Sequence, residues 1–295
     1  MIKAALLLIT GSVMWGISWI PLDALARIGI DGLWLLFVSH GILALILILY
    51  IKRKSLSSLS SIPIKEQLIM ALAGGGAIVL FTLAVMYGKV VMVMALFFLL
   101  PVWGSLLGWL LLGESMTPLR VVNVLIAVGG AWLVLGHLKI IDSPPGIYEL
   151  MGLGAGFLFA VNNVSFRRTQ SISLESKTAV MFIGCSGLAL IGVLLGFGKT
   201  DISAISMPAY GWLILYTFAY VLVANLCSQF GVTNLENGTA AILIVTELIA
   251  AVLSTLILKG NNLDVVQWFG CALICSAAVL EGYRLIVIRK DGAQT

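Results

Sequence analysis

Glu247 is the residue of this chain whose position most strongly suggests a functional role. Of the 13 Asp and Glu residues, it alone lies in the middle of an uninterrupted apolar run. A charged carboxylate on a lipid-facing helix costs about 2.5–3.5 kcal/mol, so a use or a partner is expected for it. The carboxyl group can bind a substrate amine or carry a coupling proton. A structural hydrogen bond between helices is the alternative.

Aromatic side chains form the second group of candidates. Trp15 and Trp19 are four residues apart, so they share one face of a helix. Such a face can hold a cation or stack on a flat solute, whereas contact with lipid or with the membrane interface is the other interpretation. The remaining aromatic candidates for solute binding are Tyr87, Phe98, Trp103 and Tyr220.

Amide side chains inside apolar runs are the third group. Asn162, Asn163 and Asn225 must find hydrogen-bond partners in a low-dielectric setting. Adjacent residues of a helix point about 100° apart, so we expect only one of Asn162 and Asn163 to face a central cavity.

Two further positions predict bending of a helix. Pro101 lacks a backbone donor and disturbs the turn that contains the Phe97 carbonyl. Gly75 is the centre of a run of three glycines, which can soften its helix. We expect Pro101 and Gly75 to serve as hinge or gating positions.

Metal binding, cofactor binding and enzyme activity are not expected. Cys271 and Cys275 share a helix face, but the only histidines, His40 and His137, lie far away in the sequence. The chain has no Walker, His-Glu-x-x-His or Gly-x-Ser-x-Gly motif, and one lone acid offers no acid–base pair. We therefore predict no catalytic residue, no metal ligand and no cofactor.

The elements that position these residues are membrane helices. The chain is 61% hydrophobic and 10% charged with a mean hydropathy of +1.12, whereas a soluble domain carries roughly 25% charged residues. A bilayer core needs about 20 apolar residues per helix. The sequence predicts ten transmembrane helices, at residues 3–21, 33–51, 67–87, 90–112, 119–137, 147–166, 177–197, 208–229, 238–258 and 264–287.

The positions of the basic residues indicate how the chain is oriented in the membrane rather than a nucleic-acid-binding site. Twelve of the 17 Lys and Arg residues fall on one side of the alternating spans, among them the cluster Lys52 to Lys54, and five fall on the other. Because cytoplasmic loops carry the excess of basic residues, both termini are expected in the cytoplasm. We predict a multi-pass protein of the bacterial inner membrane that contacts lipid and binds no nucleic acid.

Ten spans divide into two sets of five with opposite orientation. An odd number of spans per half makes the second half enter the membrane from the other side. The turn Pro144-Pro145-Gly146 marks the join, and we predict repeats at residues 1–140 and 141–295. A shift of 146 residues places the fourth span on the ninth and Pro101 on Glu247. The sequence thus favours two inverted repeats around a central cavity.

The chain resembles the drug/metabolite transporter superfamily in its ten-helix EamA-type branch. The resemblance rests on the five-plus-five layout and on the motifs Trp15-Gly16, Pro101, Leu112-Gly113-Glu114, Thr117-Pro118 and Gly129-Gly130. Two positions depart from the family pattern: Lys259-Gly260-Asn261 stands where a second Leu-Gly-Glu is common, and Glu247 stands where proline is common.

The resemblance implies a cavity lined by spans one, three, four, six, eight and nine. Spans five and ten then form a scaffold and, in some relatives, a dimer surface, so a monomer or a homodimer is expected. Family substrates are small organic molecules such as amino acids, nucleobases, quaternary amines and drugs, and many members export.

We therefore expect a secondary transporter of small organic solutes that works by alternating access. An exporter of amino acids or related metabolites, with protons or a substrate gradient as the driving force, is the first interpretation. An uptake carrier for an organic cation or a nucleoside-like solute is the alternative, and an intramembrane enzyme or a receptor is a remote one. The sequence names neither the solute nor the direction of flux, the coupling ion or the oligomeric state.

Overall fold

The computed structural model describes residues 2–30, 32–54, 59–113, 116–134, 144–169, 171–197, 200, 205–234, 243–260 and 262–292. These residues contain helices and no strand. Positions of the sequence analysis outside this part of the chain are Glu114, His137, Asn261 and the division between residues 140 and 141.

The first five predicted spans each contain a helix. The first consists of α1 (Ile2–Gly16) and α2 (Trp19–Arg27), and the second is α3 (Gly32–Lys54). After a 3-10 turn at Leu59–Ser61, the third joins α4 (Ile64–Ile69), a π-helical segment (Met70–Gly74) and α5 (Gly75–Tyr87). The fourth is α6 (Val90–Phe97) with α7 (Leu100–Leu112), and the fifth is α8 (Pro118–Val134).

The other five spans repeat this order. They are α9 (Ile147–Arg168), α10 (Leu174–Leu194), α11 (Met207–Leu215) with a π-helical segment (Tyr216–Leu222) and α12 (Val223–Asn234), then α14 (Thr246–Lys259) and α15 (Val265–Gly292). Within the described residues, seven helical stretches are long and apolar enough to cross a bilayer, and parts of α8 and α15 form shorter apolar helices. The all-helical membrane fold is confirmed.

The first span is longer than the sequence predicts. We expected it to end at residue 21, but α2 continues to Arg27. Pro21 lies in the first turn of α2, where its missing N–H removes no intrahelical bond. Arg27 and Asp23 form an i, i+4 ion pair at 2.9 Å that supports the last turn.

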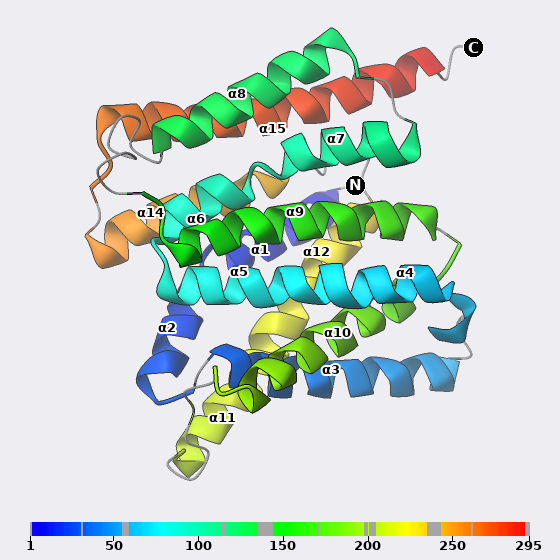
Figure 1. The fold of residues 1–295 in the computed structure, drawn as a ribbon, viewed down its shortest axis with the longest axis vertical. Helices are drawn as coiled ribbons and strands as arrows, with labels where there is room; N and C mark the ends of the chain where they lie inside the picture. Colours follow the sequence, from blue (N-terminus) through cyan, green and yellow to red (C-terminus); the bar gives the residue numbers. More distant parts are fainter. Residues whose placement is uncertain are drawn as a thin grey trace.

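The two halves are interlocked rather than placed side by side. The opening helix α1 packs on α12 and α14 of the second half, and the equivalent helix α9 packs on α5, α6 and α7 of the first. Two further pairs join equivalent helices: α3 with α10, and α8 with α15, at opposite ends of the long axis (Figure 1). α1 begins and α15 ends toward the same side of the bundle, which we call the termini end (right in Figure 1).

Interruptions of the helices recur at the 146-residue spacing. The π-helical segments begin at Met70 and at Tyr216. The fourth span is interrupted at Phe98 and Leu99, and helical structure in the ninth is interrupted at Val245, directly before α14. Because π-helical turns and broken helices are uncommon inside regular helices, their agreement in spacing supports the duplication more strongly than any sequence identity does.

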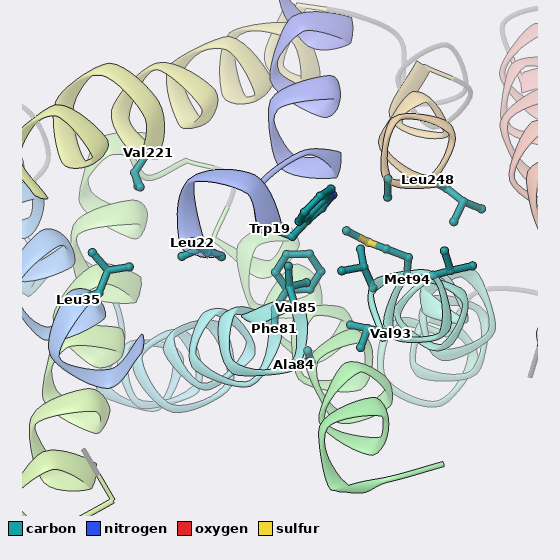
Figure 2. Packing of buried hydrophobic residues seen from close by; sticks show 14 of the residues in the cluster. Trp19, Leu22, Leu35, Phe81, Ala84, Val85, Val93, Met94, Val221 and Leu248 are labelled. Atoms are coloured by element: carbon teal, nitrogen blue, oxygen red, sulfur yellow. The ribbon is translucent and has the colours of Figure 1, made fainter. Parts of the chain in front are cut away.

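A hydrophobic cluster, which we call the closed cluster, joins the two halves on the side opposite the termini end (Figure 1). Trp19 of α2 lies among Phe81 and Val85 of α5, Met94 of α6 and Leu248 of α14 (Figure 2). All five are nearly inaccessible to solvent. Because these helices come from both halves, the cluster joins the halves and closes the space between them at this level.

Candidate functional site

The candidate site is built around the interruption between α1 and α2. Ile17 and Ser18 leave the regular helix, and the Ser18 N–H donates to the Trp15 carbonyl at 3.1 Å. This three-residue turn replaces the usual bond to the Met14 carbonyl. The Tyr220 hydroxyl of the second half donates to the Met14 carbonyl instead.

Glu247 lies against the same interruption. It is in the first turn of α14, and its side chain is 9% exposed. A Cβ atom on Gly16 would collide with the Glu247 carbonyl oxygen and lie 3.1 Å from the Ala251 amide nitrogen. Only glycine allows this approach, so Gly16 brings the backbone of α14 directly onto the end of α1.

Two tyrosines form one wall of the region. Tyr216 and Tyr220 belong to the second π-helical segment, and their rings stack with centroids 5.6 Å apart and planes at 11°. Glu247 lies within electrostatic range of Tyr220. Among the described residues, no basic side chain forms an ion pair with Glu247. Trp15 is half-buried beside the interruption.

Trp19 belongs to the hydrophobic cluster that joins the two halves. Its Nε1 donates to Ser254 Oγ at 2.9 Å, and the Lys259 ammonium lies 4.4 Å from the ring centroid. Both partners belong to α14. A cation over an indole ring is a favourable contact. The side chain is 5% exposed, so in this conformation Trp19 joins the two halves instead of lining open space.

The two adjacent asparagines differ in burial: Asn162 is buried and Asn163 is exposed. Asn162 is 2% exposed and packs on Gly74, where a Cβ atom would collide with Asn162 Oδ1. That oxygen is buried and has no hydrogen-bond partner in the described part of the chain. Asn163 is exposed. The third amide, Asn225, donates to the Val221 carbonyl of its own helix at 3.1 Å.

The other aromatic candidates pack against aromatic neighbours. Phe98 is 5% exposed and contacts the Phe97 ring. Trp103 packs edge-on against Phe157 at 5.4 Å, with its Nε1 buried. Tyr87 is at the end of α5, 39% exposed and 5.4 Å from the Tyr148 ring. The structure therefore brings Tyr220 and Glu247 together beside the interruption that follows Trp15, whereas Phe98, Trp103 and Tyr87 contact other aromatic rings.

The two hinge candidates have different surroundings. The fourth span stops at Phe97 and restarts at Leu100, so Pro101 occupies the first turn of α7, as expected for a residue without an N–H. Gly75 lies where α5 crosses α10, and a Cβ atom there would collide with the Cys185 backbone nitrogen. Gly75 thus allows close packing of two helices, and its gating role stays a prediction.

Several residues of this region were not expected from the sequence. They are Gly16 as a packing surface for α14, and Ser254 and Lys259 as partners of Trp19. Gly16 beside Trp15 was visible as part of a family motif. Nothing in the sequence signals the contacts of Ser254 and Lys259, because they depend on how α14 is rotated against α2.

The two-repeat architecture agrees with comparisons to known proteins. The pattern of the EamA-like transporter family matches residues 2–136 and again residues 146–281. The chain belongs to the EamA-like transporter family. The predicted family is confirmed, and this EamA-like protein is a membrane transporter of small solutes.

A solved structure supports the fold of this EamA-like transporter. That structure, described as "Crystal structure of protein", superposes with a TM-score of 0.63 over 94% of this chain and 96% of that chain. The two sequences are 16% identical, so the likeness concerns the fold alone. No curated protein matches the chain.

Proposed function

We propose that this EamA-like transporter exports amino acids or related metabolites by alternating access. The proposal rests on one observation: Glu247, Gly16 and the Tyr220–Met14 contact meet at the interruption of the first span. Secondary transporters bind solutes near the bilayer midplane where helices are discontinuous. Glu247 on α14 and the gap between α1 and α2 fit that pattern.

The chemistry of the region suits a zwitterion. An ammonium group needs acceptors, which the Glu247 carboxyl and the carbonyls at the interrupted turn supply. A carboxylate needs donors, and the first turn of α14 begins directly after the interruption at Val245. A helix N-terminus favours a negative charge. An amino acid carries both groups and would use both sets of contacts.

The closed end suggests how access alternates. The cluster of Trp19, Phe81, Met94 and Leu248 blocks the side opposite the termini end. We propose that the halves rock about the region of Glu247, that the interruption before Pro101 lets α6 and α7 bend against each other, and that Trp19 leaves its contacts with α14 when this end opens. Protons on Glu247 then couple transport to the gradient.

Counterflow in proteoliposomes tests the proposal. Labelled amino acids and a labelled quaternary amine are compared for the natural protein, for Glu247→Gln and for Glu175→Gln, a control acid in the first turn of α10. We expect amino-acid counterflow that Glu247→Gln lowers about a hundredfold, the effect of losing about 3 kcal/mol from a buried charged contact. Glu175→Gln should leave it unchanged.

Two results would redirect the proposal. Counterflow that does not respond to Glu247→Gln at any pH would remove Glu247 from the mechanism. Counterflow of the quaternary amine without that of amino acids would favour the second candidate, uptake of an organic cation. The position of Tyr220 near the Glu247 carboxyl, with Tyr216 stacked on it, makes that candidate specific, because an aromatic and acidic enclosure selects cations.

A further inference from the structure

A cavity separates α2 from α11 and the second π-helical segment. Its volume is about 500 Å³, which lies in the range of about 300–1,000 Å³ found for small-molecule sites. The residues that line it are Pro21, Ala24, Leu25, Ile28, Trp212, Leu215, Tyr216, Ala219 and Tyr220. Glu247 is absent from this lining, so the cavity is distinct from the candidate solute site, although Tyr220 borders both.

The cavity lies at bilayer depth and opens outward. Its walls belong to two of the membrane-crossing stretches, Ile2–Arg27 and Met207–Ser228. Trp212 and Leu215 are 58% and 51% exposed, although they are apolar and contribute to the wall. On a membrane helix, side chains that are exposed in this way face lipid.

The chemistry of the lining selects a hydrocarbon. The walls are aliphatic and aromatic, and their polar side-chain atoms are the hydroxyls of Tyr216 and Tyr220 and the indole nitrogen of Trp212. The Tyr220 hydroxyl is engaged with the Met14 carbonyl. Apolar cavities stay dry, because a water molecule needs two to four polar partners. A cavity that opens to the bilayer core and excludes water is filled by an acyl chain.

A basic side chain lies where a lipid headgroup would be. Arg27 ends α2, directly before Ile28 of the lining, and its side chain is 78% exposed. Its Nε and Nη2 atoms contact Asp23 Oδ2 at 3.0 and 2.9 Å. A guanidinium has five N–H donors and can bind phosphate while it keeps a carboxylate contact.

From this arrangement we infer that the cavity binds one acyl chain of a phospholipid whose phosphate is held by Arg27. The chain packs on the stacked pair Tyr216 and Tyr220, and Tyr220 holds the interruption of the first span through Met14. An occupied cavity therefore keeps α2 and α11 at their present spacing. The lipid acts on the transporter as a structural ligand, whatever solute is carried.

Native mass spectrometry of the purified protein tests the inference. The protein is incubated with a phosphatidylglycerol of defined chain length, and the bound lipid is titrated. Ala219→Phe fills the cavity from the second π-helical segment, whereas Ile214→Phe adds bulk to an exposed position outside the lining. We expect one tightly held lipid in the natural protein and in Ile214→Phe, and affinity weaker by about tenfold or more in Ala219→Phe.

A second measurement does not depend on a cavity-filling variant. In liposomes whose lipids carry brominated acyl chains, Trp212 should be quenched, so the natural protein should lose a larger fraction of its fluorescence than Trp212→Phe does. Arg27→Gln should weaken binding of phosphatidylglycerol about fivefold and leave binding of diacylglycerol, which lacks the phosphate, unchanged.

The results that overturn the inference are equally definite. Lipid retained by Ala219→Phe as tightly as by the natural protein would exclude the cavity as the site. Equal fractional quenching in the natural protein and Trp212→Phe would do the same. Displacement of the lipid, one for one, by a solute active in counterflow would identify the cavity as a solute portal instead. Equal effects of Arg27→Gln on both lipids would remove the phosphate contact.

Discussion

The two halves use equivalent positions in opposite ways. At the 146-residue spacing, Gly16 of the first half corresponds to Asn162 of the second, and Gly74 corresponds to Tyr220. Gly16 packs on the Glu247 backbone and Tyr220 bonds to Met14, two residues before Gly16, so one contact region between the halves has its small residue on the first helix of the repeat. Asn162 and Gly74 form the other, where the small residue is on the third. The helices are duplicated, but the positions of the small and the large side chain are reversed between the two contact regions.

The exchange has a structural consequence. Directly after Gly16 the first span is interrupted, and the freed Met14 carbonyl takes its hydrogen bond from Tyr220 of the other half. Where Asn162 and Gly74 meet, α9 runs unbroken from Ile147 to Arg168. One half thus has an interrupted first helix whose freed carbonyl is bound by the other half, and the other half supplies a continuous helix. The comparison teaches that a symmetric fold can hold a one-sided site.

The continuous helix also anchors its neighbour at both ends. Glu149 of α9 accepts a hydrogen bond from the Lys89 backbone N–H at the start of α6, at 2.9 Å. Arg168 donates to the Leu111 carbonyl at the end of α7, at 3.0 Å. A carboxylate at a helix N-terminus and a guanidinium at a C-terminus both complement the helix dipole. We therefore expect α6, α7 and α9 to keep their ends together while the interruption at Phe98 and Leu99 bends.

The largest effect is expected from adding a side chain at Gly16. Gly16→Ala places a methyl group on the Glu247 backbone, which cannot rotate away. We expect a loss of about 3 kcal/mol of stability, at the upper end for overpacked sites, and loss of solute counterflow. Thermal unfolding in detergent measures the first. Gly104→Ala is the control, because a Cβ atom there meets nothing within 4 Å; equal behaviour of the two variants would contradict the assigned contact.

Removing the Tyr220 hydroxyl, which donates to the Met14 carbonyl at the interruption, should have the next largest effect. Tyr220→Phe leaves the Met14 carbonyl without its partner, and an unsatisfied buried acceptor costs about 1–3 kcal/mol. We expect a lower midpoint of thermal unfolding and slower counterflow. Tyr216→Phe keeps the stacked rings and serves as the matched control. If Tyr216→Phe were the more damaging change, the hydrogen bond to Met14 would not be what stabilises the interruption.

The contact between Gly74 and Asn162 should tolerate substitution better than the contact at Gly16. Gly74→Ala meets the side chains of Asn162 and Met181, which can change rotamer, so we expect a cost of about 1 kcal/mol. Asn162→Ala in the same chain should restore stability, since it also removes a buried oxygen that has no partner in the described residues. A double-mutant cycle by thermal unfolding measures this coupling. Additive effects would mean that the two residues do not compete for space.

The smallest effect is expected at the anchor of α6. Glu149→Gln keeps an acceptor oxygen for the Lys89 N–H but loses the charge, so we expect a cost of about 0.5 kcal/mol. Because α9 forms this contact at the end that holds the closed cluster, the variant should also increase labelling of a cysteine introduced at Tyr148. Glu175→Gln, which lies in the first turn of α10, is the control. Unchanged labelling would separate the anchor from the motion of α6.

Sequence alone determined the number and approximate limits of the spans, the division into five and five, and the family. It did so because each residue's cost of transfer into the bilayer is a local property that survives whatever the residue later contacts. The same holds for the interruption before Pro101, which follows from a missing donor. Gly113 and Gly260, with φ of 70° and 64°, likewise end their helices by backbone freedom alone.

Only the tertiary structure decided how each helix is rotated and which side chains meet. Trp15 and Trp19 share a helix face by spacing, but the interruption at Ile17 and Ser18 separates them, and Trp19 enters the closed cluster. The choice between Asn162 and Asn163 depended on the position of Gly74. Helix association within a bilayer depends on close packing and on hydrogen bonds between distant segments. Those partners are set by the assembled bundle, which no single segment of the chain encodes.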